Sequence, residues 1–372
     1  MNSLKLTAVA AALMLAGSAY AANAQIYGLI DTGLNYQHID TDAEGAHSVN
    51  KMQLRGSQLA PNRFGFRGSE DLGNGMKIAF LLEGQFGSDD GTLTGNRLFN
   101  RSSEISIISA DYGTLTVGRS GALRSGFGST GIWGAKTGPW SNSAGEFVAG
   151  HKYIMPGGFK AVDNAITYKT PTMSGLTLHA QYSAKMDSTN QKDEREFNHE
   201  SNRLWALAAT YSHGAFNAVA VLDSVMYSQT AGNRPDDGIA FSLEADYNFG
   251  FAKVYAAGMS FKDMKGGDFQ GHEALGSLEK GIAYDGYSLE LGSDIPLCGG
   301  TAKVNVGWMD AENADNGKNG TYRIALSGGY VYPLSKRTQF YSAAGWVQDK
   351  SNKQNDCKPS AVEVLAGVLH RF

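Results

Sequence analysis

Beyond its first two dozen residues, the sequence lacks any apolar run near the ~20 residues that a membrane-spanning helix needs. It also has few prolines, 8 in 372 residues, and only two cysteines. The missing runs exclude helical membrane spans, so the chain can cross a bilayer only as a closed β-barrel. Disorder is excluded as well, because disordered segments are poor in aromatics, whereas this chain has 17 Tyr and 17 Phe beside 47 Gly.

Residues 1–24 have the pattern of a secretory signal peptide. Lys5 supplies a positive charge, residues 8–16 form a short apolar core, and small residues follow. Two cleavage sites of the A-x-A type end at Ala21 and Ala24, and we favour the second. The chain is therefore predicted to be exported, with residues 25–372 forming one domain.

Short alternating segments fill most of the remaining chain. Between residues 62 and 68, Phe64 and Phe66 point one way and Arg63 and Arg67 the other. In a water-filled barrel, such phenylalanines face lipid and such arginines face the lumen. On this basis the fold is predicted to be all-β, an antiparallel transmembrane β-barrel of sixteen strands. The predicted strands are Gln25–Tyr36, Asn62–Gly68, Met76–Phe86, Arg101–Ser109, Gly113–Arg119, Asn164–Thr170, Leu176–Ala184, Arg203–Ser212, Phe216–Ser228, Gly238–Asn248, Phe251–Lys262, Ile282–Pro296, Ala302–Asn313, Thr321–Tyr332, Gln339–Lys350 and Ser360–Phe372.

The predicted connections alternate between short turns, such as His213-Gly214, and long polar loops, such as residues 37–51 and 185–202. This asymmetry is typical of outer-membrane barrels, which have short periplasmic turns and longer outside loops. A soluble sandwich or propeller also has many short strands, but it predicts no alternation in loop length. The strand order places Cys298 and Cys357 at opposite ends of the barrel, too far apart for a disulfide, so two free thiols are expected.

The connection from Arg119 to Asp163 is long and glycine-rich, with neither helical nor two-residue periodicity. A structureless connection of that length is usually functional in a compact domain. Residues 120–163 are therefore predicted to fold into the lumen, with Trp133 and Trp140 packing them against the wall rather than stacking on sugars. From Arg119 to Lys160 this loop has five cations and one acid: Arg119, Arg124, Lys136, Lys152, Lys160 and Glu146.

Several stretches, spread in order over the mature chain, resemble the general porins of Gram-negative bacteria, especially the trimeric β-proteobacterial kind. The matching stretches begin at Tyr27 (YGLID), Arg63 (RFGFRGSEDLG), Arg97 (RLFNR), Tyr112 (YGTLTVGR), Tyr330 (YVYPLSKRT) and Val362, the start of the last strand. The resemblance implies a sixteen-stranded homotrimer whose third outside loop forms an eyelet, and whose loop 87–99 latches onto a neighbouring subunit. It also implies that the barrel-assembly machinery recognises the terminal Phe372.

In the family, wall arginines line one side of the eyelet and loop acids line the other. By motif, Arg63 and Arg119 occupy the wall positions, and Arg67, Lys77 and Arg101 are weaker candidates. Strict alternation from Ile105 would turn Arg101 outward unless its strand has a bulge. A third wall arginine often precedes a Val-x-Asn motif, but Ala161 stands there, beside Lys160, and leaves that cation uncertain. Within the loop, Arg124, Glu146 and Asp163 complete the predicted constriction.

A constriction with more cations than acids lowers the energy of an anion and raises that of a cation. The sequence therefore predicts an outer-membrane general diffusion porin that passes small hydrophilic solutes and prefers anions. Its expected partners are outer-membrane lipid and lipopolysaccharide, with no nucleic acid. The acids of the outside loops are interpreted as a solvated face rather than a divalent-cation site: Asp187, Asp193, Glu194, Glu196, Asp236, Asp237 and Asp268.

No enzyme, cofactor or metal is predicted. The glycine run that starts at Gly126 fits G-x-G-x-x-G, but no βαβ unit surrounds it. The histidines form no H-E-x-x-H motif, and the cysteines lack metal-site spacing. Three alternatives stay open: a solute-specific porin, an outer-membrane lipid hydrolase using His179 or His213, and a soluble extracellular binding module.

Overall fold

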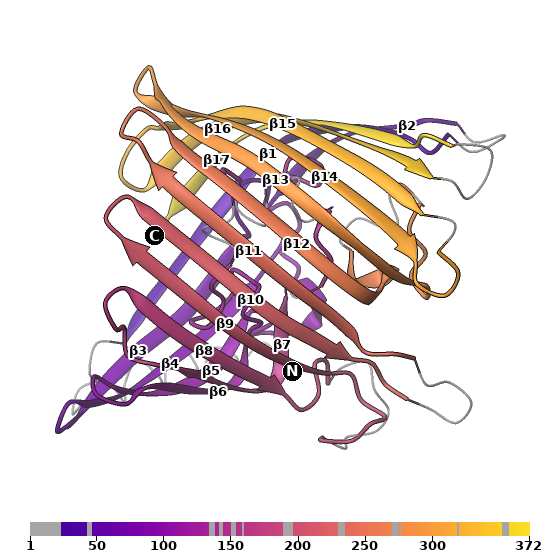
Figure 1. Ribbon diagram of the computed structural model, residues 1–372. Helices are drawn as coiled ribbons and strands as arrows, with labels where there is room; N and C mark the ends of the chain where they lie inside the picture. The colour runs from indigo at the N-terminus through magenta and orange to yellow at the C-terminus, as the bar shows by residue number, and fades with distance from the viewer. Residues whose placement is uncertain are drawn as a thin grey trace, which may run out of the picture.

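The computed structural model describes residues 24–42, 47–133, 138–140, 144–149, 154–157, 160–188, 196–229, 235–269, 275, 277–317, 320–351 and 357–372. Its strands form one antiparallel sheet, which closes because β1 (Gln25–Asp40) pairs with β17 (Ser360–Arg371). Figure 1 shows the resulting barrel, with strands that tilt together and coiled chain inside. Nearly all of the predicted signal peptide lies outside the described residues, as do Lys136, Lys152, Asp193 and Glu194.

The strands and short helices between these two are β2 (Val49–Gly56), β3 (Arg63–Gly73), β4 (Met76–Gln85), η2 (Thr94–Asn96), β5 (Ser102–Ser109), β6 (Gly113–Gly121), β7 (Ala161–Lys169), β8 (Leu176–Ser183), β9 (Arg203–His213), β10 (Phe216–Met226), β11 (Gly238–Asn248), β12 (Lys253–Lys265), η3 (Gly266–Asp268), β13 (Ala283–Leu297), β14 (Gly300–Asn313), β15 (Thr321–Pro333) and β16 (Thr338–Ser351).

The second position of the wall is divided between two strands. β2 pairs with the half of β1 from Thr32 to Ile39, and β3 pairs with the half from Gln25 to Leu29. Together β2 and β3 make one wall position, so the predicted sixteen-stranded barrel is confirmed. The prediction of a loop over residues 37–51 was wrong, because β1 continues to Asp40 and β2 begins at Val49.

The break between β2 and β3 depends on Asp31 in β1. The Asp31 carboxylate accepts the backbone N–H groups of Leu59 and Ala60, and its backbone carbonyl accepts the N–H of Ser57 at 2.9 Å. These bonds give partners to the backbone N–H groups of residues 57, 59 and 60, at the point where the pairing of β1 with β2 ends. The break is set by contacts between distant residues, which the local sequence does not reveal.

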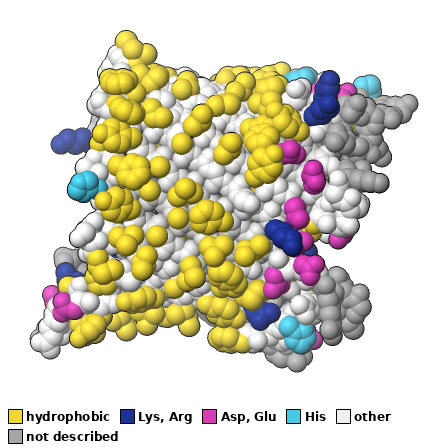
Figure 2. Space-filling view, viewed as in Figure 1, with side chains coloured by type: hydrophobic (Ala, Val, Ile, Leu, Met, Phe, Trp, Pro, Cys, Tyr) yellow, Lys and Arg dark blue, Asp and Glu magenta, His cyan; other side chains and the backbone are white. Residues whose placement is uncertain are grey.

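Side chains alternate between the two faces of the wall. On β13, Tyr287, Leu289 and Leu291 are exposed on the outer face, whereas Ser288 and Glu290 are buried on the lumenal face. Figure 2 shows the outer apolar side chains spread across one face, with charges gathered toward the end that carries the long loops. This is the pattern of a barrel in lipid. No helix among the described residues has the length and apolarity to span a membrane.

The two barrel ends differ as predicted. Strands β9 and β10 are joined at His213 and Phe216 by a tight turn, as are β13 and β14 at Leu297 and Gly300. Figure 1 shows these short turns at one end and the long connections at the other. The free Cys298 lies in a short turn, and the free Cys357 lies in the long connection before β17.

Candidate functional site

The described parts of the chain between β6 and β7 fold into the lumen and pack against the wall. Their large apolar side chains are fully buried there, including Trp133, Trp140 and Phe147. Glycines in the wall make room for them. A Cβ at Gly345 would lie 2.3 Å from the carbonyl oxygen of Phe147, and one at Gly329 would lie 2.7 Å from the Trp140 ring. The predicted inward loop and the packing role of both tryptophans are confirmed.

Near its start, the loop is held by Arg124, whose side chain is fully buried. The guanidinium forms an ion pair with Asp223 of β10 and donates to the carbonyl of Pro156 at 2.8 Å, on the returning part of the loop. Burial lowers the pKa of Arg124 to about 9, although the negative charge of Asp268 acts to raise it. The group therefore remains charged at neutral pH, and it joins the loop to the wall rather than lining the water-filled space.

Near its middle, the loop is held by Glu363 of β17. One oxygen of this buried carboxylate accepts the backbone N–H groups of Glu146 and Phe147, each at 2.7 Å. The other oxygen accepts from Asn35 at 2.7 Å and Gln37 at 3.2 Å in β1. Hydrogen bonds to an ionised acceptor are the strong ones. Glu363 therefore attaches the loop to the wall at a point far from Arg124 in sequence.

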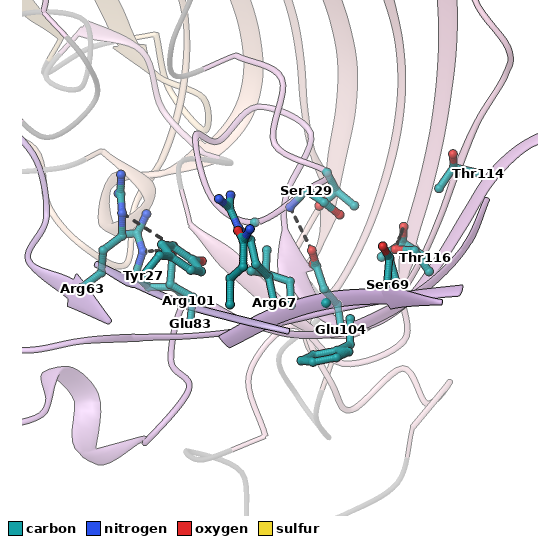
Figure 3. Close-up of a pocket in the computed structure, with 18 of the residues that line it drawn as sticks. Tyr27, Arg63, Arg67, Ser69, Glu83, Arg101, Glu104, Thr114, Thr116 and Ser129 are labelled. Carbon is teal, nitrogen blue, oxygen red and sulfur yellow. Dashed lines mark hydrogen bonds and ion pairs between the residues drawn. The ribbon is translucent and has the colours of Figure 1, made fainter. Parts of the chain in front are cut away.

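A cavity of about 930 Å³ lies between the first part of the inward loop and the wall formed by β1, β3 to β8 and the end of β17. Figure 3 shows Arg63, Arg67 and Arg101 projecting from this wall, with Glu83 and Glu104 among them. Of the described side chains that line the cavity, five are cationic and two are acidic: Arg63, Arg67, Arg101, Lys169 and Arg371 against Glu83 and Glu104.

The two acids are shielded from water. Glu83 is 6% exposed and Glu104 is 4% exposed. Glu83 accepts the Tyr27 hydroxyl at 2.8 Å, pairs with Arg101, and lies 3.6 Å from Arg63. Glu104 accepts the loop N–H of Ser129 at 2.9 Å. By contrast, the side chains of three lining cations are exposed to the lumen: Arg67, Lys169 and Arg371.

The comparisons with known proteins agree with this architecture. The family model described as Gram-negative porin matches residues 7–352. The chain belongs to the Gram-negative porin family. An outer membrane porin protein of Bordetella pertussis is 29% identical, covering 99% of this porin and 100% of that relative. Outer membrane porin protein 32 of Delftia acidovorans is also 29% identical, over 93% of this porin and 90% of that relative.

A solved structure with the same fold is the anion-selective porin from Comamonas acidovorans, with a TM-score of 0.66 and 24% identity. The match covers 94% of this chain and 99% of the chain from Comamonas acidovorans. The protein described here is thus an outer-membrane β-barrel of the porin class.

The structure places Arg63 and Arg67 in the cavity lining, as the alternation predicted, and Arg101 beside them. Arg101 turns inward because of a bulge. Ser102 lies opposite Glu83 in the strand register, and Arg101 donates its backbone N–H to the carbonyl of the same Glu83. Two consecutive residues therefore face one residue of β4, which is a β-bulge. The Arg101 guanidinium lies 4.3 Å from the centre of the Phe127 ring of the loop.

Arg119 and Asp163 belong to a different cluster. Arg119 lies opposite Ser103, an outward-facing residue, and forms an ion pair with Asp163. Arg97, from the loop after β4, donates to both Asp163 oxygens at 2.8 and 2.9 Å and to Asp187 at 2.9 Å. The hydrogen bonds to Asp163 raise the pKa of Arg97. These charges tie two loops together, and neither Arg119 nor Asp163 lines the cavity.

The remaining predicted residues are spread over the barrel. Lys77 is exposed near the short turn between β3 and β4, and Lys160 is exposed where the loop returns to β7. Glu146 pairs with Arg55 of β2 at 3.2 Å, and neither residue lines the cavity. Phe372 exchanges backbone hydrogen bonds with Gly28, at 3.1 and 3.2 Å, where β1 and β17 close the barrel.

Four charged residues of the wall were not predicted from the sequence as site residues: Glu104, Lys169, Glu363 and Arg371. Each lies at a lumenal position of its strand or at the strand end, so the alternation carried a signal for them. A charge at such a position is expensive unless it has a partner or contacts water. That rule would have selected all four as candidates, but it could not have said which of them contact the loop.

Proposed function

We propose that this porin is a general diffusion channel with a preference for anions, and that the exposed Arg67, Lys169 and Arg371, with the half-buried Arg63 beside them, form the wall side of its selectivity site. One observation carries the proposal: the acids of the cavity are buried and hydrogen-bonded, whereas most of its cations are exposed to the lumen. An exposed cation lowers the energy of a passing anion. The relative from Comamonas acidovorans carries the description anion-selective.

Planar-bilayer recordings test this proposal. Under a salt gradient, the zero-current potential of the purified porin should lie toward the chloride equilibrium value. The double variant Arg63→Ala/Arg67→Ala should move it toward zero, and Lys160→Ala, an exposed cation outside the cavity, should leave it unchanged. A cation-selective potential for the unmodified porin would refute the anion preference.

The same recordings separate the two remaining alternatives. A solute-specific porin would show conductance that one solute saturates and blocks, whereas a general channel shows neither. A barrel enzyme would hydrolyse phospholipid or ester in detergent and would conduct no ions.

We further propose that the working form is a homotrimer in contact with outer-membrane lipid and lipopolysaccharide, inserted by the barrel-assembly machinery through Phe372. The backbone bonds between Phe372 and Gly28 support this role, because the terminal residue closes the barrel. Loss of insertion on deletion of Phe372, with normal export, would support it.

A further inference from the structure

The strands β2 and β3 carry cations at a constant spacing along β1. In the strand register, Lys51 and Arg55 of β2 lie opposite positions 37 and 33 of β1. Arg63 and Arg67 of β3 lie opposite positions 29 and 25. Successive cations are therefore four residues of β1 apart, even across the break between β2 and β3. A strand rises about 3.3 Å per residue, so each step is about 13 Å.

These four side chains belong to the lumenal face of the wall. Residues directly opposite each other in an antiparallel pair share one face of the sheet. Gln37, which lies opposite Lys51, is buried inside the barrel and donates to Glu363 at 3.2 Å. Arg55 lies 3.2 Å from Glu146 of the inward loop. The two cations of β3 line the cavity, as Figure 3 shows.

The two ends of this series differ from its middle in their pairing with acids. Lys51 and Arg67 are exposed, and in the described part of the chain neither forms an ion pair. The side chain of Arg55 is 35% exposed beside Glu146, and that of Arg63 is 28% exposed at 3.6 Å from Glu83. The end cations thus act with their full charge, whereas the middle ones are partly neutralised but still contact water.

The spacing is short enough for the fields of neighbouring cations to overlap. A solute midway between two of them lies about 6–7 Å along the wall from each, which is within the screening length of about 8 Å at physiological salt. An anion that moves along this wall from Lys51 to Arg67 therefore stays within the field of at least one cation. The attraction is proportional to the charge of the solute, so a divalent anion gains twice as much energy as chloride at each step.

We propose that Lys51, Arg55, Arg63 and Arg67 form a cation ladder that makes this porin prefer divalent oxyanions, such as sulfate and hydrogen phosphate, over chloride. Lys51 and Arg55 are its outer specificity residues, and neither lines the cavity. Glu146 contacts the ladder at Arg55 and weakens the attraction at that step. The proposal rests on the anion preference proposed above, because a cation-selective pore would favour neither kind of anion.

Permeability ratios in planar bilayers test the ladder. With potassium sulfate on one side and potassium chloride on the other, the zero-current potential of the purified porin measures the sulfate-to-chloride permeability ratio. A cation about 6–7 Å away in salt water favours a divalent anion about 2–3-fold and a monovalent anion about 1.5-fold. Lys51→Gln should therefore lower the ratio about 1.5-fold, and Lys51→Gln/Arg55→Gln should lower it about twofold.

Two controls separate the ladder from charge in general. Lys51→Arg keeps the cation and should keep the ratio. Lys350 is an exposed cation of β16 beside another long connection, but it lies opposite Tyr322, which is 40% exposed on the outer face. Lys350→Gln should leave the ratio unchanged. An unchanged ratio in Lys51→Gln, or an equal fall in Lys350→Gln, would overturn the proposal.

Glu146→Gln should change the ratio in the opposite direction. It removes the nearer acid partner of Arg55, while the backbone N–H of residue 146 keeps its bond to Glu363. The sulfate-to-chloride ratio should rise, and a fall would contradict the ladder. If the unmodified porin is anion-selective in a chloride gradient but none of these variants alters the ratio, the ladder is refuted and the proposed function stands. A cation-selective potential would refute both.

Discussion

The carboxylate of Glu363 should control how firmly the inward loop is held. In the variant Glu363→Gln, one amide oxygen can still accept the N–H groups of Glu146 and Phe147, but the charge is gone. Hydrogen bonds to a charged group contribute about 1.5–3 kcal/mol and neutral ones about 0.5–1.5 kcal/mol. The two loop bonds should together lose about 2 kcal/mol.

This loss should be visible in single-channel currents. A difference of 1.4 kcal/mol is a tenfold change in an equilibrium constant, so 2 kcal/mol raises the population of the detached loop about 30-fold. The variant should show more frequent transient changes of conductance, and the segment Ala144–Ala149 should exchange its amide hydrogens faster. The conductance between these events should stay near that of the unmodified porin, because the wall is unchanged.

Asp349→Asn serves as the control. Asp349 is also a fully buried carboxylate of the wall, but it pairs with Arg323 and Ser277 rather than with the inward loop. Its replacement should lower thermal stability without altering the current record. If Glu363→Gln leaves both conductance and hydrogen exchange unchanged, or if Asp349→Asn changes them equally, the loop does not depend on Glu363.

Three further predictions concern charge and closure. The anion preference from Arg63 and Arg67 should weaken between 0.1 M and 1 M salt in reversal-potential measurements, since the screening length falls from about 10 Å to about 3 Å. Arg97→Met should destabilise the porin to heat by about 1–3 kcal/mol, because Asp163 stays buried with fewer donors, and circular dichroism in detergent would measure it; an unchanged melting temperature would contradict this. Deleting Phe372 should reduce the amount of inserted barrel in membrane fractions without blocking export, and normal insertion would refute its role in closure.

The alternation of side chains made most of the barrel predictable. Phe64 and Phe66 point away from the lumen while Arg63 and Arg67 line it, because a two-residue period is a property of the strand itself. The predicted bounds of most strands agree with the structure to within a few residues. β2 was not predicted because Lys51, Gln53 and Arg55 make the segment polar, so that it has the composition of a loop.

The pore site was harder to predict because bulges change the direction of single side chains. Arg119, which the resemblance to known porins placed at the eyelet, lies at a register shift between Gly118 and Ser120, and its side chain pairs with Asp163 rather than lining the cavity. Arg101 shows the opposite case, since a bulge opposite Glu83 turns it inward. A bulge depends on pairing between strands, which no single segment encodes.

Among the described charges of the inward loop, Arg124 and Glu146 are held in ion pairs rather than left free to act on the pore, and burial explains why. A charge buried against a wall is stable only when it has a partner or several hydrogen bonds. Arg124 is neutralised by Asp223, and Glu146 pairs with Arg55, so the described ends of this charge pattern act as attachments. The described cations that can act on a passing solute are those that remain exposed on the wall, such as Arg67 and Lys169. Selectivity in this porin should therefore respond to substitution of the exposed wall cations, and attachment of the loop to substitution of the buried groups that hold it, such as Arg124 and Glu363.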